Sequence, residues 1–229
     1  MDSFLEFIRH ALEEQADPEI SRGMGAYMKT SQKCYGVKAP ERRQIFREAR
    51  LRFPVKTFDE YRELILALWQ GESREEMYMA LDVAEYYKKF QTNDAMDLYE
   101  KLLETATNWD LVDPIAGSLV SRLVMKNRAH EARLQQWLHS ENFWFRRSAL
   151  LAHLRHQDTT NVPLLEASIL QLMHEKEFFI RKAIGWVLRG YSYVDPEWVQ
   201  AFVKQHENEL SGLSKREALK AIHRKASRL

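Results

Sequence analysis

The chain has 229 residues, of which 45% are hydrophobic and 29% are charged, and its formal net charge is +1. This length can form one large domain or two small ones with a sizeable core, and the near-neutral charge excludes a polycation. Residues 141–229 nevertheless hold 14 Lys and Arg against 10 Asp and Glu. That local excess of positive charge allows an anionic partner without requiring one.

Amphipathic segments with helical periodicity begin at the N-terminus. Residues 1–15 form the first, and they lack the uninterrupted apolar core of a signal peptide. Asp17-Pro18 is typical of an N-cap followed by Pro at the first helical position. Apolar residues then recur every three or four positions in residues 40–53 and 58–69, which predicts a helix in each.

The same periodicity continues through the rest of the chain. Ser73–Glu76 and Ser214–Glu217 have capping-box patterns, and Asp195-Pro196 repeats the arrangement of Asp17-Pro18. Further helices are predicted at residues 75–90, 95–106, 141–154, 164–174, 176–191 and 196–207. No linker divides them, and Gly (8) and Pro (6) are scarce. The sequence thus predicts one all-α domain over residues 1–229, an α-α superhelix (solenoid) of helix-pair repeats.

Aromatic and cationic residues return at nearly one step along these helices. Trp69, Trp109, Arg147 and Trp186 are separated by 40, 38 and 39 residues. A step of about 40 residues is the length of a helix-pair repeat, and residues one repeat apart line up on one face. With Asp113, they would form a concave surface that could stack on a sugar, oppose positive charge and hold a phosphate.

Each of these residues also has an ordinary structural explanation. An Asp before a Pro, as in Asp113-Pro114, is typical of an N-cap. Arg147 follows Arg146 in a helix, where a single Arg is most often a solvated surface residue. Tryptophans at helical spacing usually belong to the core, and we expect this of Trp69, Trp137, Trp144 and Trp198.

Six short motifs nonetheless occur in a recognisable order: Ala26–Lys29, Pro40–Gln44, Trp109-Asp110-x-x-Asp113, Trp144-x-x-Arg147, Lys176–Arg189 and Leu213–Ala218. Through them the chain resembles the AlkD-type DNA alkylation repair glycosylases, an all-helical family built from HEAT-like repeats. The resemblance extends from about Tyr27 to Arg224. It implies a superhelix with a concave DNA-binding groove.

The resemblance also implies roles for individual residues. Asp113 takes the position of the catalytic carboxylate, and Trp109 and Trp186 those of two tryptophans that hold the sugar-phosphate of the damaged nucleotide. Arg147 takes the position of the arginine beside them, where we expect it to hold a flanking phosphate. Tyr27 corresponds to a tyrosine that lines the same cleft.

The chemistry implied is excision of cationic N3-alkyladenine and N7-alkylguanine from duplex DNA by a monofunctional glycosylase in base excision repair. A cationic purine leaves as a neutral base, so one carboxylate suffices, and no metal or other cofactor is called for. The resembled family grips the DNA backbone without flipping the base. Pro114 departs from the family pattern, in which we expect a small polar residue, and it could tilt Asp113.

Basic stripes support a grip on the backbone. Arg216, Lys220, Arg224 and Arg228 recur every four residues in the last helix, and Arg43, Arg47 and Arg50 form a shorter stripe. Such stripes alone are typical of solvated faces, but the resemblance favours phosphate contacts. We expect the DNA-binding residues to be Tyr27, Lys29, Arg43, Lys182, Arg189, Lys215, Arg216, Lys220 and Arg224.

Two other functions remain open. A non-catalytic relative would bind DNA structures without releasing bases, and a HEAT-type scaffold would bind protein through an apolar groove. Cys34 is the only cysteine, which fits a reducing cytosol, and His153 and His156 lack the further ligands of a metal site. No apolar run of about 18 residues could span a membrane, and we expect a cytoplasmic protein that associates with the nucleoid when bound to DNA. We expect a monomer because a solenoid offers no evident dimer patch.

Overall fold

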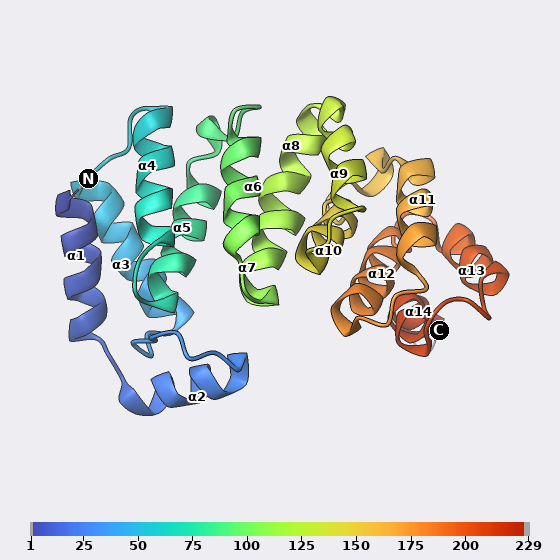
Figure 1. The fold of residues 1–229 in the computed structure, drawn as a ribbon, viewed down its shortest axis with the longest axis horizontal. Helices are drawn as coiled ribbons and strands as arrows, with labels where there is room; N and C mark the ends of the chain where they lie inside the picture. Colours follow the sequence, from blue (N-terminus) through green and yellow to red (C-terminus); the bar gives the residue numbers. More distant parts are fainter. Residues whose placement is uncertain (1, 227–229) are drawn as a thin grey trace. The chain divides into compact units, whose positions relative to one another are not determined.

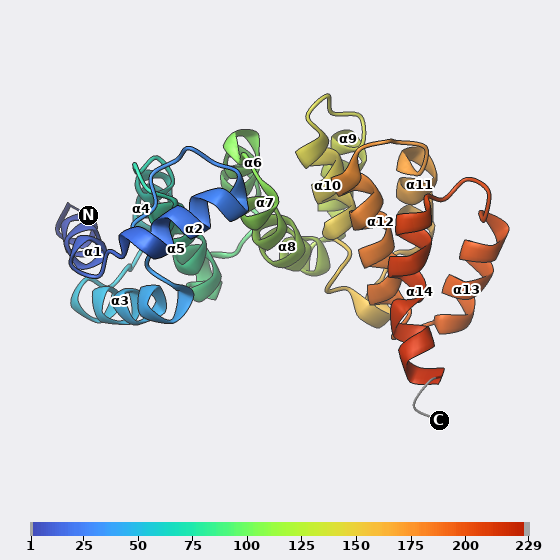
Figure 2. The same ribbon diagram turned by 90° about the horizontal axis from the view of Figure 1, so that it is seen from below.

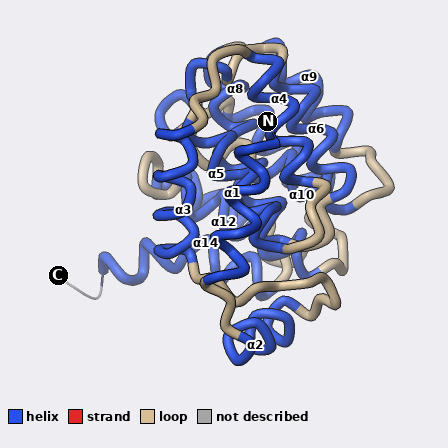
Figure 3. Tube along the Cα trace, turned by 90° about the vertical axis from the view of Figure 1, so that its left-hand side faces the viewer, coloured by secondary structure: helices blue, strands red, loops and turns tan. Residues whose placement is uncertain are grey.

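The computed structural model describes residues 2–226 and is helical throughout (Figure 3). Within these residues there is no strand, and the only β-type pairing is an isolated bridge between Lys33 and Ser73. The predicted all-α fold is therefore confirmed. None of the helices described combines the length and the apolar character needed to cross a membrane.

The chain divides into two compact units, Met1–Leu98 and Tyr99–Leu229, with the boundary inside α6. In the first unit α4 packs against α5, and α1 packs against α3, while α2 lies to one side of them (Figures 1 and 3). The elements of this unit before α6 are α1 (Asp2–Glu14), α2 (Pro18–Met28), α3 (Ala39–Arg52), α4 (Phe58–Trp69), α5 (Arg74–Tyr86) and the short 3₁₀ helix η1 (Lys88–Phe90).

Side-chain caps explain several of the helix starts. Asp17 accepts hydrogen bonds from the backbone N–H groups of the first turn of α2, and Ser73 forms the predicted capping box with Glu76 at the start of α5. The capping box predicted at Ser214 is wrong. Its helix begins two residues earlier, and the Ser214 hydroxyl instead donates to the backbone carbonyl of Arg181, 2.8 Å away.

A buried carboxylate holds the loop that follows α2. Glu75 is fully buried and accepts hydrogen bonds from the backbone N–H groups of Tyr35, Gly36 and Val37. Gly36 has a φ of 86°, and a Cβ there would lie 2.2 Å from the backbone oxygen of Asp17. The loop can therefore adopt this path only with glycine at that position. These hydrogen bonds attach the loop at the end of α2 to α5.

The second unit is a succession of short helices (Figures 1 and 2). Helix α12 packs against α10 and α14, and α10 also contacts α7 and η2. The elements are α6 (Ala95–Thr105), α7 (Trp109–Pro114), the π-helix η2 (Ile115–Val120), α8 (Ser121–Lys126), η3 (Arg128–His130), α9 (Glu131–Trp137), α10 (Phe143–Leu151), η4 (Gln157–Thr159), α11 (Val162–Leu172), α12 (Phe178–Tyr191), α13 (Pro196–Gln205) and α14 (Gly212–Ala226).

Helices α12 and α14 approach closely because α12 carries a glycine at their contact. A Cβ on Gly185 would lie 2.5 Å from the Cβ of Glu217 and 2.8 Å from the backbone oxygen of Ser214. Beside this contact the Glu217 carboxylate binds Lys182 at 2.9 Å and Arg189 at 2.6 Å. The two ion pairs, both from α12 to α14, lower the pKa of Glu217, chiefly through the hydrogen bond from Lys182.

Helix α7 begins earlier than an N-cap at Asp113 would require. Asn108 is the N-cap, so Asp113 and Pro114 lie inside the helix and the N-cap interpretation of Asp113 is wrong. Pro114 has no backbone N–H to donate to the carbonyl four residues before it. The helix continues directly as η2, whose wider turns are rare and frequently occur at functional sites. Of the tryptophans predicted to pack, Trp69, Trp137 and Trp144 are buried, whereas Trp198 is partly exposed.

Candidate functional site

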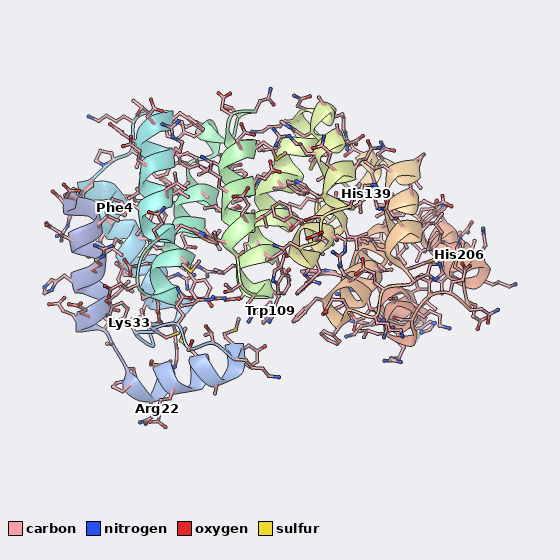
Figure 4. The ribbon with its side chains drawn as sticks, in the orientation of Figure 1. Phe4, Arg22, Lys33, Trp109, His139 and His206 are labelled. Carbon is pink, nitrogen blue, oxygen red and sulfur yellow. The ribbon has the colours of Figure 1, made fainter. Side chains whose placement is uncertain are left out.

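A cleft of about 860 Å³ opens on the second unit between α7 and α12. Trp109 and Asp113 reach it from α7, because residues four apart lie on one helix face. Leu111 and Val112 are fully buried, which turns that face outward. Trp186 lines the same cleft from α12. Figure 4 labels Trp109 at the start of α7. Three predicted site residues are thus brought together.

The carboxylate of Asp113 is held by the guanidinium of Arg147. Nε donates to Oδ1 and Nη2 donates to Oδ2, each over 2.8 Å, which is the two-pronged geometry of strong Arg–carboxylate pairs. Nη1 donates to the backbone carbonyl of Phe179, 2.5 Å away. The Arg147 side chain is only 3% exposed, and that of Asp113 is 13% exposed. Three elements, α7, α10 and α12, are therefore joined at one guanidinium.

This arrangement differs from the phosphate-holding role expected for Arg147. The hydrogen bonds from its Nε, Nη1 and Nη2 go to protein groups in a buried position. In this structure the guanidinium of Arg147 therefore orients the carboxylate of Asp113. The sequence could not separate these roles, because it did not show which groups surround the arginine.

Burial and Arg147 act on Asp113 in opposite directions. Burial raises the pKa of the Asp113 carboxyl, because the charged form loses contact with water, and the hydrogen bonds and charge of Arg147 oppose that rise. The net direction is upward from the usual value of 3.8. A carboxylate held at the edge of a cleft and poorly hydrated is suited to stabilising a positive charge that forms beside it.

A second, smaller cleft of about 380 Å³ shares Trp186, Gly190 and Tyr193 with the first. Three of the predicted DNA-binding residues line it: Arg189, Lys220 and Arg224. Lys182 does not line this cleft, but it shares the Glu217 carboxylate with Arg189. Of the three residues that line both the cleft with Asp113 and the cleft with Arg189, two are aromatic, Trp186 and Tyr193.

The remaining residues predicted to bind DNA lie elsewhere. Lys215 donates to the backbone carbonyl of Glu207 and lines a third cleft between α13 and α14, whereas Arg216 is exposed. Arg228 lies outside the described residues. In the first unit the exposed candidates are Tyr27, Lys29, Arg43 and Arg47, while Arg50 donates to the hydroxyl of Tyr86.

Two residues that line the cleft beside Asp113, Arg155 and Tyr193, were not predicted from the sequence. Asp110, known from the motif with Trp109, adds a second carboxylate to the cleft, and Arg155 adds positive charge. Tyr193 is 78% exposed although it is a large aromatic residue. It follows Trp186 by seven residues, or about two helical turns, and that spacing could have identified it.

The two histidines considered as metal ligands belong to the core. His153 and His156 are 4% and 1% exposed, and their rings lie 5.4 Å apart, edge to face. The part of the chain that the structure describes contains no group of three or more His, Cys, Asp or Glu side chains arranged for a metal ion. Burial lowers the pKa of His153 to about 3.

Comparison with known proteins covers most of the chain. Residues 8–222 match the model of the family described as DNA alkylation repair enzyme. The chain belongs to this family. A predicted DNA alkylation repair enzyme from Enterococcus faecalis has 31% sequence identity and a TM-score of 0.82, over 90% of this chain and 96% of its own. No curated protein matches the sequence.

More distant structures share the family fold. AlkD2 from Streptococcus mutans has 17% identity and a TM-score of 0.61, over 87% of this chain and 98% of its own. The smu.31 protein from Streptococcus mutans UA159 has 16% identity and a TM-score of 0.59, over 87% and 97%. The resemblance inferred from six motifs is thus confirmed, as is the AlkD-type repeated-helix fold.

Proposed function

We propose that the protein is a DNA glycosylase that hydrolyses the N-glycosidic bond of N3-alkyladenine and N7-alkylguanine in duplex DNA. The observation that supports this most directly is the cleft in which Trp109, Trp186 and the Arg147-bound Asp113 carboxylate meet. Membership of the DNA alkylation repair enzyme family points to the same class of damage.

The reaction begins with the lesion itself. The C1′–N bond breaks and its electron pair stays on the purine nitrogen, so the cationic base leaves neutral and needs no proton from an acid. The deoxyribose becomes an oxocarbenium ion, which the Asp113 carboxylate stabilises. Water then adds at C1′ and releases a proton, either to the carboxylate or to solvent. A single carboxylate is enough because the usual second one serves to protonate the leaving group.

The aromatic residues of the cleft also stabilise the positive charge of the oxocarbenium ion. Trp109 and Trp186 line the cleft, and the negative quadrupole of an indole face attracts a cationic sugar. Arg147 keeps Asp113 oriented, and a carboxylate that is already oriented stabilises the transition-state charge more than a mobile one would. An open cleft also allows the lesion to be approached from the backbone, without extrusion of the base.

Exposed polar residues, most of them cationic, are available to bind the DNA backbone. Lys220 and Arg224 of the second cleft, with the exposed Tyr27, Lys29 and Arg43 of the first unit, are our candidates for phosphate contacts. Four to six such contacts would give a slope of roughly −4 to −5 in log K against log salt. We propose that the protein acts as a monomer, which sedimentation at micromolar concentration would test.

The decisive experiment is release of 7-methylguanine and 3-methyladenine from methylated duplex DNA, followed by chromatography in the presence of EDTA. We expect release above the spontaneous rate, with Asp113→Asn slower by about 10² in single turnover and still able to bind DNA. If the wild-type protein binds DNA but releases no base, the protein is a DNA-structure binder. Undiminished release by Asp113→Asn would remove Asp113 from the chemistry.

A further inference from the structure

The cleft beside Asp113 contains a cationic group that none of the six sequence motifs includes. Arg155 is exposed and, among the described residues that line this cleft, it is the only Lys or Arg. Arg147, the arginine expected to hold a phosphate, is buried against Asp113. The cleft thus presents one accessible guanidinium beside its carboxylates.

This guanidinium is held in place rather than mobile. Nε of Arg155 donates to the backbone carbonyl of Gly117 over 3.0 Å, and Nη2 donates to the hydroxyl of Ser118 over 2.7 Å. Both acceptors belong to the π-helix η2. Two hydrogen bonds to neighbouring residues restrict a side chain that would otherwise lose much rotamer freedom on binding a ligand.

The π-helix also sets the distance from Arg155 to the reacting group. Gly117 follows Asp113 by four residues, so the backbone that anchors Arg155 lies about one helical turn from the backbone of Asp113, roughly 6 Å along the axis. A Cβ on Gly117 would lie 3.2 Å from a methyl carbon of Leu154. Glycine therefore lets the segment that carries Arg155 pack closely against η2.

Arg155 can bind a part of the DNA that the other residues of this cleft do not attract, namely a negatively charged phosphate. The hydrogen bonds to η2 use Nε and one N–H of Nη2, and Nη1 makes no hydrogen bond to another described residue. An anchored guanidinium with further N–H groups to donate matches the geometry of a phosphate. We propose that Arg155 binds the DNA phosphate next to the nucleotide whose sugar lies against Asp113. This inference rests on the proposed function.

The experiment measures binding instead of excision, so it does not depend on turnover. The probe is a fluorescein-labelled duplex with one tetrahydrofuran nucleotide, a stable sugar without a base. We expect Arg155→Ala to weaken binding about tenfold, as loss of one charge-assisted hydrogen bond would, and to reduce the salt slope by about one. Lys204→Ala is the control, since it removes one exposed charge from a separate cleft.

A neutral methylphosphonate beside the tetrahydrofuran nucleotide, placed on its 5′ or its 3′ side, identifies the phosphate. On one of these sides we expect the replacement to weaken wild-type binding about tenfold and to leave Arg155→Ala unchanged, because the two changes remove the same contact. Arg155→Lys guards against a folding defect in the alanine variant. It should retain the salt slope but bind less tightly, since lysine retains the charge without the fork of donors.

Two results would overturn the assignment of Arg155. One is binding by Arg155→Ala that equals that of Lys204→Ala, and the other is a methylphosphonate effect of the same size in wild type and variant on both sides. Either result leaves the proposed glycosylase intact. Conversely, wild-type protein that binds the duplex with the expected dependence on Arg155 but releases no methylated base would retain the phosphate site and remove the catalytic role.

Discussion

Replacing Asp113 by Asn should destabilise the protein as well as slow excision. The amide oxygen can accept one of the two hydrogen bonds that Arg147 donates at 2.8 Å, but the NH₂ group would face the other donor. The guanidinium is 3% exposed, so water cannot replace the missing acceptor. Breaking a buried pair by removing one partner costs about 3–5 kcal/mol. Because one hydrogen bond survives, we expect about 3 kcal/mol, the lower end.

Thermal unfolding followed by circular dichroism measures this change. For a chain of this length 3 kcal/mol corresponds to a fall in Tm of about 6–12 °C. The double variant Asp113→Asn, Arg147→Met is the control, since it removes the buried cation together with its partner. We expect it to recover more than half of the lost Tm while excision stays slow. A single variant that unfolds within about 2 °C of wild type would refute the reasoning, as would a double variant less stable than the single one.

Three further predictions follow from buried groups. Arg147→Met removes the positive charge that opposes the rise in the pKa of Asp113, so that pKa should rise further. The fall of the excision rate on the acidic side of the pH profile, corrected for release from enzyme-free DNA, should therefore move to higher pH. An acidic limb at the same pH as in wild type would contradict this. Because His153 has a pKa of about 3 in the folded protein, the unfolded chain takes up its proton first as pH falls below about 6.5, which lowers the free energy of unfolding. His153→Leu should therefore make the free energy of unfolding in urea depend less on pH between pH 7 and 5. An unchanged dependence on pH would contradict this. Gly185→Ala should lower stability by about 1–3 kcal/mol in the same assay, because the new methyl group meets the backbone of Ser214, and an unchanged midpoint would show that α14 moves aside freely.

The helices and the site residues could be predicted from the sequence to different degrees. Periodicity and caps gave the helical segments because both depend on neighbours in the chain, as Asp17 and Ser73 show. The resemblance placed Trp109, Asp113 and Trp186 together, and they do line one cleft. These positions depend on the fold of the family as a whole.

What the sequence could not supply were contacts between distant residues. The interpretation of Asp113 as an N-cap was wrong because Asn108 caps the helix, which runs from Trp109 through Pro114 and continues as a π-helix. The burial of Arg147 depends on Phe179, 32 residues away in the chain. Arg155 is anchored by residues 37 and 38 positions before it. No local pattern records such partners.

The pairing of Asp113 with Arg147 has a consequence for how this family can change over time. A chain that lost the carboxylate alone would retain a buried cation without its counter-ion, at a cost comparable to a large share of total stability. We therefore expect descendants that abandon catalysis to replace the arginine as well, in either order but in close succession. The two positions should vary together among relatives, and a lone arginine without its carboxylate should be rare.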